Sequence, residues 1–218
     1  MQNHKQLLDW VGRSLCLLLP VIGLLVLQGM PASALTVDAI ASGRWLTLWS
    51  GHLLHYTMDH FMWDALMFVV FTCLLWPKER WGMWLWLVVA APVISILVFL
   101  VEPGLQEYRG LSALDTMLYV RFCIGLLRSA SKWDRWLFGA LPVFGLTLKI
   151  GYEWMTEQAL FVTDLGAGVV PLPSAHLAGL VLGLLWGITR AAQQYPNALR
   201  RMAATGHSSV EDPLSARC

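Results

Sequence analysis

Six apolar runs, each near the length of a membrane-crossing helix, constrain this chain more than any other feature. They cover residues 11–29, 60–76, 81–101, 112–127, 136–152 and 172–189, with breakers such as Pro31, Pro77 and Pro103-Gly104 between them. A helix needs about 20 apolar residues to cross the roughly 30 Å hydrocarbon core of a bilayer. Only 13% of the 218 residues are charged, whereas a soluble domain carries about 25%. We therefore predict an all-α membrane protein with six transmembrane helices.

The placement of Lys and Arg predicts the orientation of these helices. One side collects most of the positive charge (Lys5, Arg13, Lys78, Arg80, Arg128, Lys132, Arg135, Arg190, Arg200, Arg201 and Arg217), and the other side has only Arg44 and Arg109. Because positively charged loops stay in the cytoplasm, both termini are expected there. We expect a first transmembrane helix in residues 1–30, a membrane core over 31–192 and a polar cytoplasmic tail over 193–218.

An alternative interpretation makes residues 1–34 a secretory signal. Ala32-Ser33-Ala34 fits a small-residue cleavage pattern after a basic start and an apolar stretch. However, Asp9 lies in the supposed basic region, and the apolar run through Leu27 is long enough to span a bilayer. These features favour a retained helix.

Polar side chains from three helices are expected at one depth. Ser112 lies 16 residues before Arg128 and His176 lies 14 before Arg190, so each stands about 21–24 Å from the cytoplasmic end at 1.5 Å per residue. His60 and Asp64 reach a similar level when counted from Pro77. Ionisable groups inside a bilayer are costly and usually mark a function. The shared depth predicts a site below the outer membrane surface.

The fourth run is too short to span a bilayer, since 16 residues make only about 24 Å of helix. It must begin inside the membrane, after a dipping segment over residues 102–111. Irregular backbone at that depth is tolerated where it lines a wet cavity or is buried in protein. Ser112 is thus predicted at a hydrated helix N-terminus, where free N–H groups favour an anion.

The sixth run repeats small residues at Ala175, Gly179, Gly183 and Gly187, a face that another helix can approach closely. Such an approach would bring Ser112 within reach of His176, as a nucleophile and its general base.

Three motifs together resemble the rhomboid family of intramembrane serine proteases. They are Gly110-Leu111-Ser112-Ala113, Ala175-His176-Leu177-Ala178-Gly179, and His55 with His60-Phe61-Met62-Trp63-Asp64. The resemblance covers most of residues 40–190. It implies a six-helix rhomboid-like bundle with a short fourth helix, Ser112 as nucleophile and His176 as base. It also implies that His60 and Asp64 support the oxyanion, together with Gly110 and the backbone N–H groups of Leu111 and Ser112.

Within that family the chain is most similar to rhombosortases, through His52 and His55, Trp63-Asp64 and Tyr108-Arg109-Gly110-Leu111-Ser112. These bacterial enzymes process proteins with a C-terminal tail of Gly-Gly, an apolar helix and a basic cluster. The resemblance implies a serine endopeptidase of the bacterial inner membrane that needs no cofactor and acts on membrane-anchored proteins. The net charge of +1 gives no reason to expect a nucleic-acid partner.

Two departures from the family pattern leave alternatives open. Ala113 replaces the usual glycine, and Asp64 replaces an asparagine whose amide would face the oxyanion; an ionised carboxylate there would repel it. A catalytically silent helix-binding adaptor is therefore a second hypothesis. A third is a metal-binding protein that uses His52, His55, Asp59, His60 and Asp64, although we expect no metal. Asp115 and Arg121 are assigned to packing or snorkelling. Cys16, Cys73, Cys123 and Cys218 show no zinc or disulfide spacing.

Overall fold

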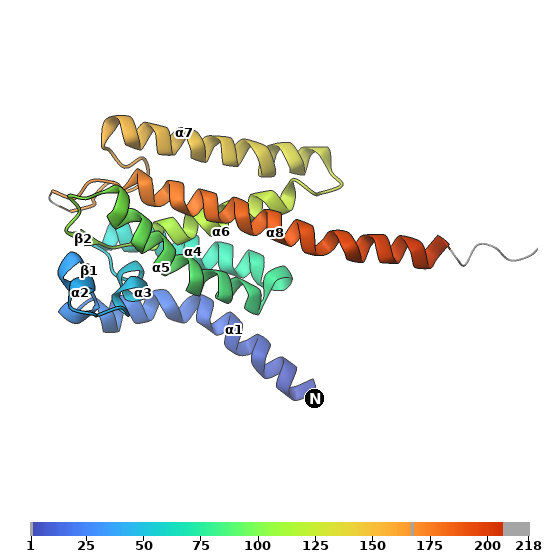
Figure 1. The fold of residues 1–218 in the computed structure, drawn as a ribbon, viewed down its shortest axis with the longest axis horizontal. Coiled ribbons are helices and arrows are strands. Elements are labelled where there is room, and N and C mark those ends of the chain that lie inside the picture. The colour runs from blue at the N-terminus through green and yellow to red at the C-terminus, as the bar shows by residue number, and fades with distance from the viewer. Residues whose placement is uncertain (1, 167, 207–218) are drawn as a thin grey trace, which may run out of the picture.

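The computed structural model describes residues 2–166 and 168–206, and this part of the chain is almost wholly helical (Figure 1). The longer helices are α1 (Gln2–Ile22, continued by η1, Gly23–Leu27), α4 (Met58–Glu79), α5 (Trp81–Val101), α6 (Ser112–Leu126), η4 (Asp134–Ala140) running into α7 (Leu141–Thr156), and α8 (Pro173–Gly206). The short elements are η2 (Pro31–Ser33), β1 (Leu35–Thr36), α2 (Val37–Ala41), α3 (Thr47–Ser50), η3 (Gly51–Leu53) and β2 (Glu107–Tyr108).

Among the described residues, four helices are long and apolar enough to cross a membrane. They are Gln6–Leu27, Met58–Glu79, Trp81–Val101 and Pro173–Gln193. This confirms the prediction of an all-α membrane protein. The helix α6 has 15 residues, one fewer than the run from which we predicted a short helix, and it begins at Ser112 as expected.

The end of α8 and a short pair of strands differ from the prediction. The helix α8 was expected to end at about Thr189, but it continues as one helix to Gly206 and so includes part of the predicted polar tail over residues 193–218. The strands β1 and β2 were not predicted at all; they pair antiparallel, with Leu35 opposite Tyr108 and Thr36 opposite Glu107. This pairing holds the segment before α6 against the segment after α1. Arg217 and Cys218 lie outside the described residues, while Cys16, Cys73 and Cys123 are free thiols.

The seam between α6 and α8 is the closest helix contact near the cavity described below. A Cβ added at Gly179 would overlap the backbone carbonyl oxygen of Ala113, and one at Gly183 would lie 2.7 Å from the carbonyl oxygen of Met117. Ala175, the first residue of this small-residue face, is buried. The helices can therefore approach this closely only because these positions lack larger side chains.

At the far end of the bundle, buried charges join three helices. Arg121 on α6 forms an ion pair with Glu79 on α4, and Arg190 Nε on α8 lies 2.8 Å from the same carboxylate. The guanidinium of Arg121 also lies over the Trp186 ring, 5.6 Å from its centroid, within the roughly 6 Å of a cation–π contact. The assignment of Arg121 to packing fits these contacts, which fix α6 and α8 relative to α4.

Candidate active site

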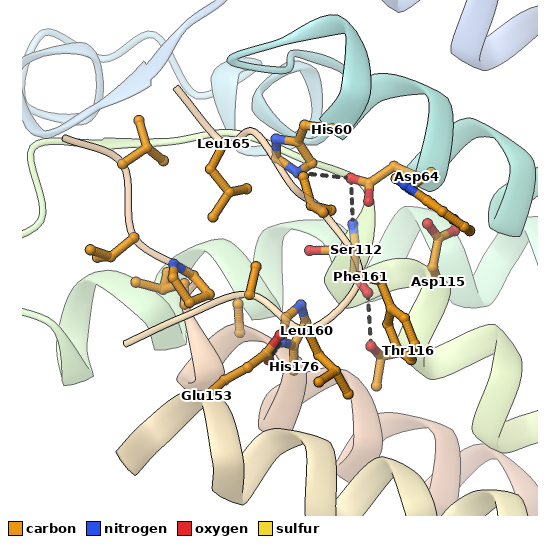
Figure 2. A pocket seen from close by; sticks show the side chains of 18 of the residues that line it. His60, Asp64, Ser112, Asp115, Thr116, Glu153, Leu160, Phe161, Leu165 and His176 are labelled. Atoms are coloured by element: carbon orange, nitrogen blue, oxygen red, sulfur yellow. Dashed lines mark hydrogen bonds and ion pairs between the residues drawn. The ribbon is translucent and has the colours of Figure 1, made fainter. Parts of the chain in front are cut away.

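A cavity of about 750 Å³ opens between α4, α6, α7 and α8, and the segment over residues 157–172 covers part of it. Ser112 and His176 both line this cavity, as do His60, Asp64 and Glu153. Figure 2 shows Ser112 and His176 facing the same space from α6 and α8. The polar side chains that were predicted to share one depth thus line a common cavity.

Ser112 is the first residue of α6. Its backbone carbonyl accepts a hydrogen bond from Thr116 Oγ1 at 2.8 Å, and its backbone N–H donates to Asp64 Oδ2 at 3.1 Å. Its hydroxyl makes no hydrogen bond within the described residues, which leaves Oγ available to a molecule in the cavity.

His176 lies in the first turns of α8 and is 8% exposed. Its Nδ1 lies 2.9 Å from Glu153 Oε2 and 3.3 Å from Lys149 Nζ. The other ring nitrogen, Nε2, has no hydrogen-bond partner in the described part of the chain, and in particular none joins it to Ser112. The two predicted catalytic side chains thus share a cavity, with no hydrogen bond between them among the described residues.

Glu153 and Lys149 are site residues that sequence reasoning missed. Both lie on α7, four residues apart, and Lys149 Nζ is 2.7 Å from Glu153 Oε1. Lys149 lies inside the apolar run 136–152, one helical turn before Glu153, and neither residue was predicted to belong to the site. Such an i,i+4 pair at membrane depth was the available signal, because a charge there needs a partner.

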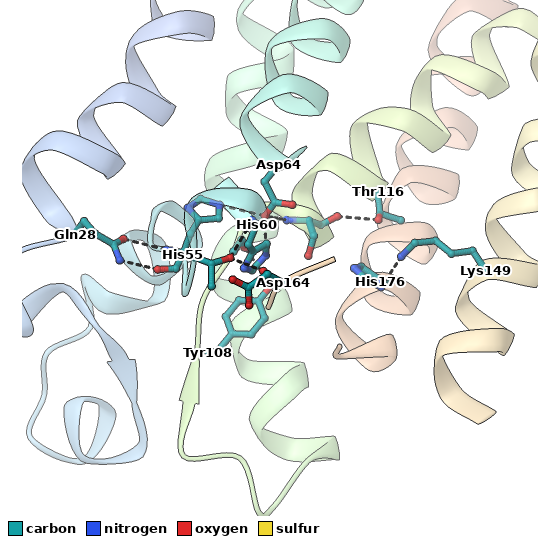
Figure 3. A network of polar contacts seen from close by, with 12 residues as sticks. Gln28, His55, His60, Asp64, Tyr108, Thr116, Lys149, Asp164 and His176 are labelled. Atoms are coloured by element: carbon teal, nitrogen blue, oxygen red, sulfur yellow. Dashed lines mark hydrogen bonds and ion pairs between the residues drawn. The ribbon is translucent and has the colours of Figure 1, made fainter. Parts of the chain in front are cut away.

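Three nitrogen atoms from different parts of the chain contact one oxygen of Asp64, Oδ2. His55 Nε2 lies 3.1 Å and His60 Nε2 3.2 Å from Asp64 Oδ2, which also accepts the Ser112 N–H (Figures 2 and 3). Gln28, just past η1, holds the peptide of His55 by two further bonds of 2.6 and 3.1 Å. In this state Asp64 therefore occupies one of the two backbone donors that the family resemblance assigns to an oxyanion, and His60 faces Asp64.

Gly110, two residues before Ser112, has a backbone φ of 119°, which residues other than glycine rarely adopt. A Cβ at this position would lie 2.9 Å from His60 Nε2 and 3.2 Å from Asp64 Oδ2. The neighbouring Leu111 N–H donates no hydrogen bond to any described residue. Gly110 therefore permits the tight turn that brings both backbone donors and Asp64 together at the start of α6.

The five candidate metal ligands separate into two groups. The ligand atoms of His55, His60 and Asp64 lie within 4.8 Å of one another. His52 points elsewhere, since its Nε2 lies 2.9 Å from the Ala91 carbonyl oxygen, and Asp59 binds the segment above the cavity. A five-residue cluster is therefore not formed.

The surroundings of His55, His60 and Asp64 also bear on whether these residues bind a metal ion. A histidine that binds metal through Nε2 usually donates its Nδ1–H to an acceptor, but His60 Nδ1 is buried without a hydrogen-bond partner among the described residues. The Asp64 oxygen is already satisfied by three donors. At His60 the group therefore lacks the outer hydrogen bond that is typical of a metal-binding histidine.

Asp59 ties the covering segment to the start of α4. Its Oδ2 accepts the Thr163 N–H at 2.9 Å, the Thr163 hydroxyl at 3.0 Å and the Asp164 N–H at 3.1 Å. The Thr57 hydroxyl donates to the Asp164 carbonyl oxygen. This contact spans about a hundred residues of sequence, and no sequence pattern pointed to it.

Two tyrosines and an arginine form the cavity wall near the β pair. Burial raises the pKa of the Tyr56 and Tyr108 phenols, so both stay neutral and donate hydrogen bonds. Tyr56 Oη donates to the Glu107 carbonyl oxygen at 3.1 Å, and the Arg109 guanidinium lies 5.1 Å from the Tyr56 ring centroid. Deeper in the cavity wall, Asp115 is buried, and its carboxylate oxygens have no hydrogen-bond partner in the described chain.

Comparison of the sequence with models of known protein families found no match, and comparison with curated proteins found none either. The chemistry available is that of the side chains themselves. Among the described residues, one cavity is lined by a hydroxyl without a hydrogen-bond partner, by an imidazole with Nδ1 beside a carboxylate and Nε2 unbonded, and by a helix N-terminus. These groups suit nucleophilic attack on a carbonyl carbon.

Proposed function

We propose that this chain is an intramembrane serine endopeptidase of the rhomboid type, which cuts membrane-anchored proteins near the outer face of the bilayer. The observation that carries the proposal is the arrangement at His176. Its Nδ1 faces Glu153 Oε2 at 2.9 Å, while Nε2 is free on the ring that shares a cavity with the unbonded Ser112 hydroxyl. A nucleophile and a base are arranged in this way in serine hydrolases of several unrelated folds.

In this proposal the shorter helices α6 and α7 join the four long ones in a six-helix bundle. Both termini then lie in the cytoplasm of a bacterial cell and the cavity opens toward the outer side of the inner membrane. The excess of Lys and Arg in the terminal segments and in the connections after α4 and α6 supports this orientation. The short α6, which begins at Ser112, lets water reach the nucleophile below the membrane surface.

The reaction proceeds in two halves. His176 Nε2 accepts the Ser112 hydroxyl proton as Oγ bonds to the substrate carbonyl carbon, and the carbonyl π electrons move to its oxygen. The C–N bond then breaks as the imidazolium returns the proton to the leaving amine. Water repeats the sequence on the acyl ester and releases the new carboxyl end. The Ser112–His176 contact closes when substrate binds, as catalytic hydrogen bonds often do.

The developing oxyanion would be held by backbone N–H groups at the start of α6. Leu111 N–H is free in the described structure, and Ser112 N–H becomes free when Asp64 releases it. Asp64 would then act by holding His55 and His60 and by ordering the resting site, instead of donating to the oxyanion as an asparagine would.

Co-expression with a candidate substrate tests this function. The full-length chain is expressed in bacteria with a secreted reporter that carries a C-terminal Gly-Gly, apolar helix and basic cluster, the tail suggested by the resemblance to rhombosortases. We expect cleavage by the native chain and none by Ser112→Ala or His176→Ala. Ser174→Ala is the matched control, because this hydroxyl is buried and has no partner among the described residues. Undiminished cleavage by Ser112→Ala at equal membrane levels would overturn the proposal.

One observation favours a second function, that of a helix-binding adaptor without catalysis. The Asp64 carboxylate already occupies the Ser112 N–H, and an oxyanion cannot share that donor with an ionised carboxylate. An adaptor would retain a bound reporter helix in pull-downs while Ser112→Ala and the native chain behave alike. Release of a cut reporter by the native chain alone separates the two functions.

A further inference from the structure

We infer that Glu153 is a positioning residue for His176, so that the proposed pair is completed as a Ser112–His176–Glu153 triad. This inference rests on the function proposed above. The family resemblance implies a serine and a histidine only, and the notable addition here is a buried carboxylate from a third helix, α7, on the far side of the imidazole from Ser112.

The carboxylate of Glu153 is fixed on both sides. Its side chain is only 2% exposed; Oε2 lies 2.9 Å from His176 Nδ1, and Lys149 Nζ lies 2.7 Å from Oε1 and 2.8 Å from Oε2. A carboxylate removed from water is costly unless it is paired and hydrogen-bonded. The ammonium of Lys149 and the ring of His176 supply those partners, which accounts for an acidic residue at this depth.

The contacts also decide which nitrogen of His176 carries the proton. A carboxylate has only acceptors, so its 2.9 Å contact with Nδ1 requires a hydrogen on Nδ1. Lys149 has only donors, and its distance of 3.3 Å to Nδ1 is longer than either of its distances to Glu153. Lys149 therefore pairs with the carboxylate, and Nδ1–H donates to Glu153. The lone pair is then left on Nε2, the nitrogen that must accept the Ser112 proton.

The experiment compares two variants in purified full-length protein. Lys149→Met removes the cation and leaves the Glu153–His176 contact; Lys149→Met/Glu153→Leu removes the carboxylate as well, without stranding a buried charge. The rate at which a fluorophosphonate modifies Ser112 is measured for both. We expect the double variant to react at least 10-fold more slowly than Lys149→Met, since loss of the orienting carboxylate costs about 10⁴-fold in trypsin. Equal rates in two folded variants would overturn the inference.

A second measurement is independent of activity and of whether the double variant folds. Nitrogen-15 spectra of histidine-labelled native protein, assigned by the signals lost in His176→Ala, report the tautomer directly. The inference requires Nδ1–H as the main form of His176; a main form protonated on Nε2 overturns it. Failure of the proposed function is distinguishable, because it would leave native Ser112 unmodified while the tautomer stayed as inferred.

Discussion

The substitution Gly179→Ala tests whether the α6–α8 contact sets the geometry of the site. The added methyl would overlap the Ala113 carbonyl oxygen, which belongs to the backbone beside Ser112 and cannot rotate away. To regain ordinary van der Waals contact the helices must separate by about 1 Å. Gly179 lies one turn after His176, so the separation falls at the level of the proposed catalytic pair.

A misplacement of about 1 Å can cost about 100-fold in rate. We therefore expect Gly179→Ala to slow fluorophosphonate modification of Ser112 by roughly that factor. The effect on stability should be small, because about 1–3 kcal/mol of overpacking is partly offset by the roughly 1 kcal/mol that alanine gains over glycine in a helix. A thermal unfolding curve in the same detergent shows that the variant is folded.

Gly187→Ala is the matched control, the same change two turns farther from the cavity. Its methyl would meet a side-chain carbon of Ile124 at 2.7 Å, so the strain falls on side-chain packing away from Ser112. We expect this variant to react within about 10-fold of the native rate, because the overpacking does not press on the backbone beside Ser112. A native rate in Gly179→Ala, or equal losses in both variants, would refute the view that this seam positions the pair.

Three further predictions follow from the described contacts. Burial lowers the pKa of His52 to about 4, below its unfolded value of about 6.5. The neutral ring therefore contributes about 3 kcal/mol to the free energy of unfolding, in full above pH 6.5 and progressively less as the pH falls toward 4. The unfolding temperature should fall less with acidification in His52→Gln than in the native chain, and parallel curves would contradict this. Asp59→Ala should speed amide hydrogen exchange at Thr163 and Asp164 about 10-fold, because hydrogen bonds to a charged group are worth about 1.5–3 kcal/mol; unchanged exchange would show that the contact does not hold the segment. Phenanthroline should leave Ser112 modification unchanged, because His60 lacks the outer hydrogen bond of a metal-binding histidine; loss of reaction that zinc restores would instead establish a metal site.

The sequence was sufficient for features that depend on local pattern. Apolar run length located the long helices, and the predicted span Trp81–Val101 matches α5 at both ends. Spacing of four between small residues identified the face of α8 that α6 contacts. Counting residues from the helix ends that were expected in the cytoplasm predicted one depth for Ser112 and His176, and both line one cavity.

The features that were missed depend on pairings between distant segments. In the sequence Glu153 is one of several acidic residues between positions 153 and 164, and only the packing of α7 beside α8 brings it to His176. The contact of Asp59 with Thr163 and the β1–β2 pair likewise join segments that share no pattern. The end of α8 was misplaced because Arg190 ends the apolar run, whereas a helix that leaves the bilayer can continue with polar residues in water.

The central claim is that His176 activates Ser112, and mass spectrometry of fluorophosphonate-treated protein tests it most directly. We predict that the peptide containing Ser112 gains the phosphonyl mass in the native chain and that His176→Ala leaves it unmodified at the same probe concentration. An unmodified Ser112 in folded native protein, or equal modification in His176→Ala, would contradict the claim.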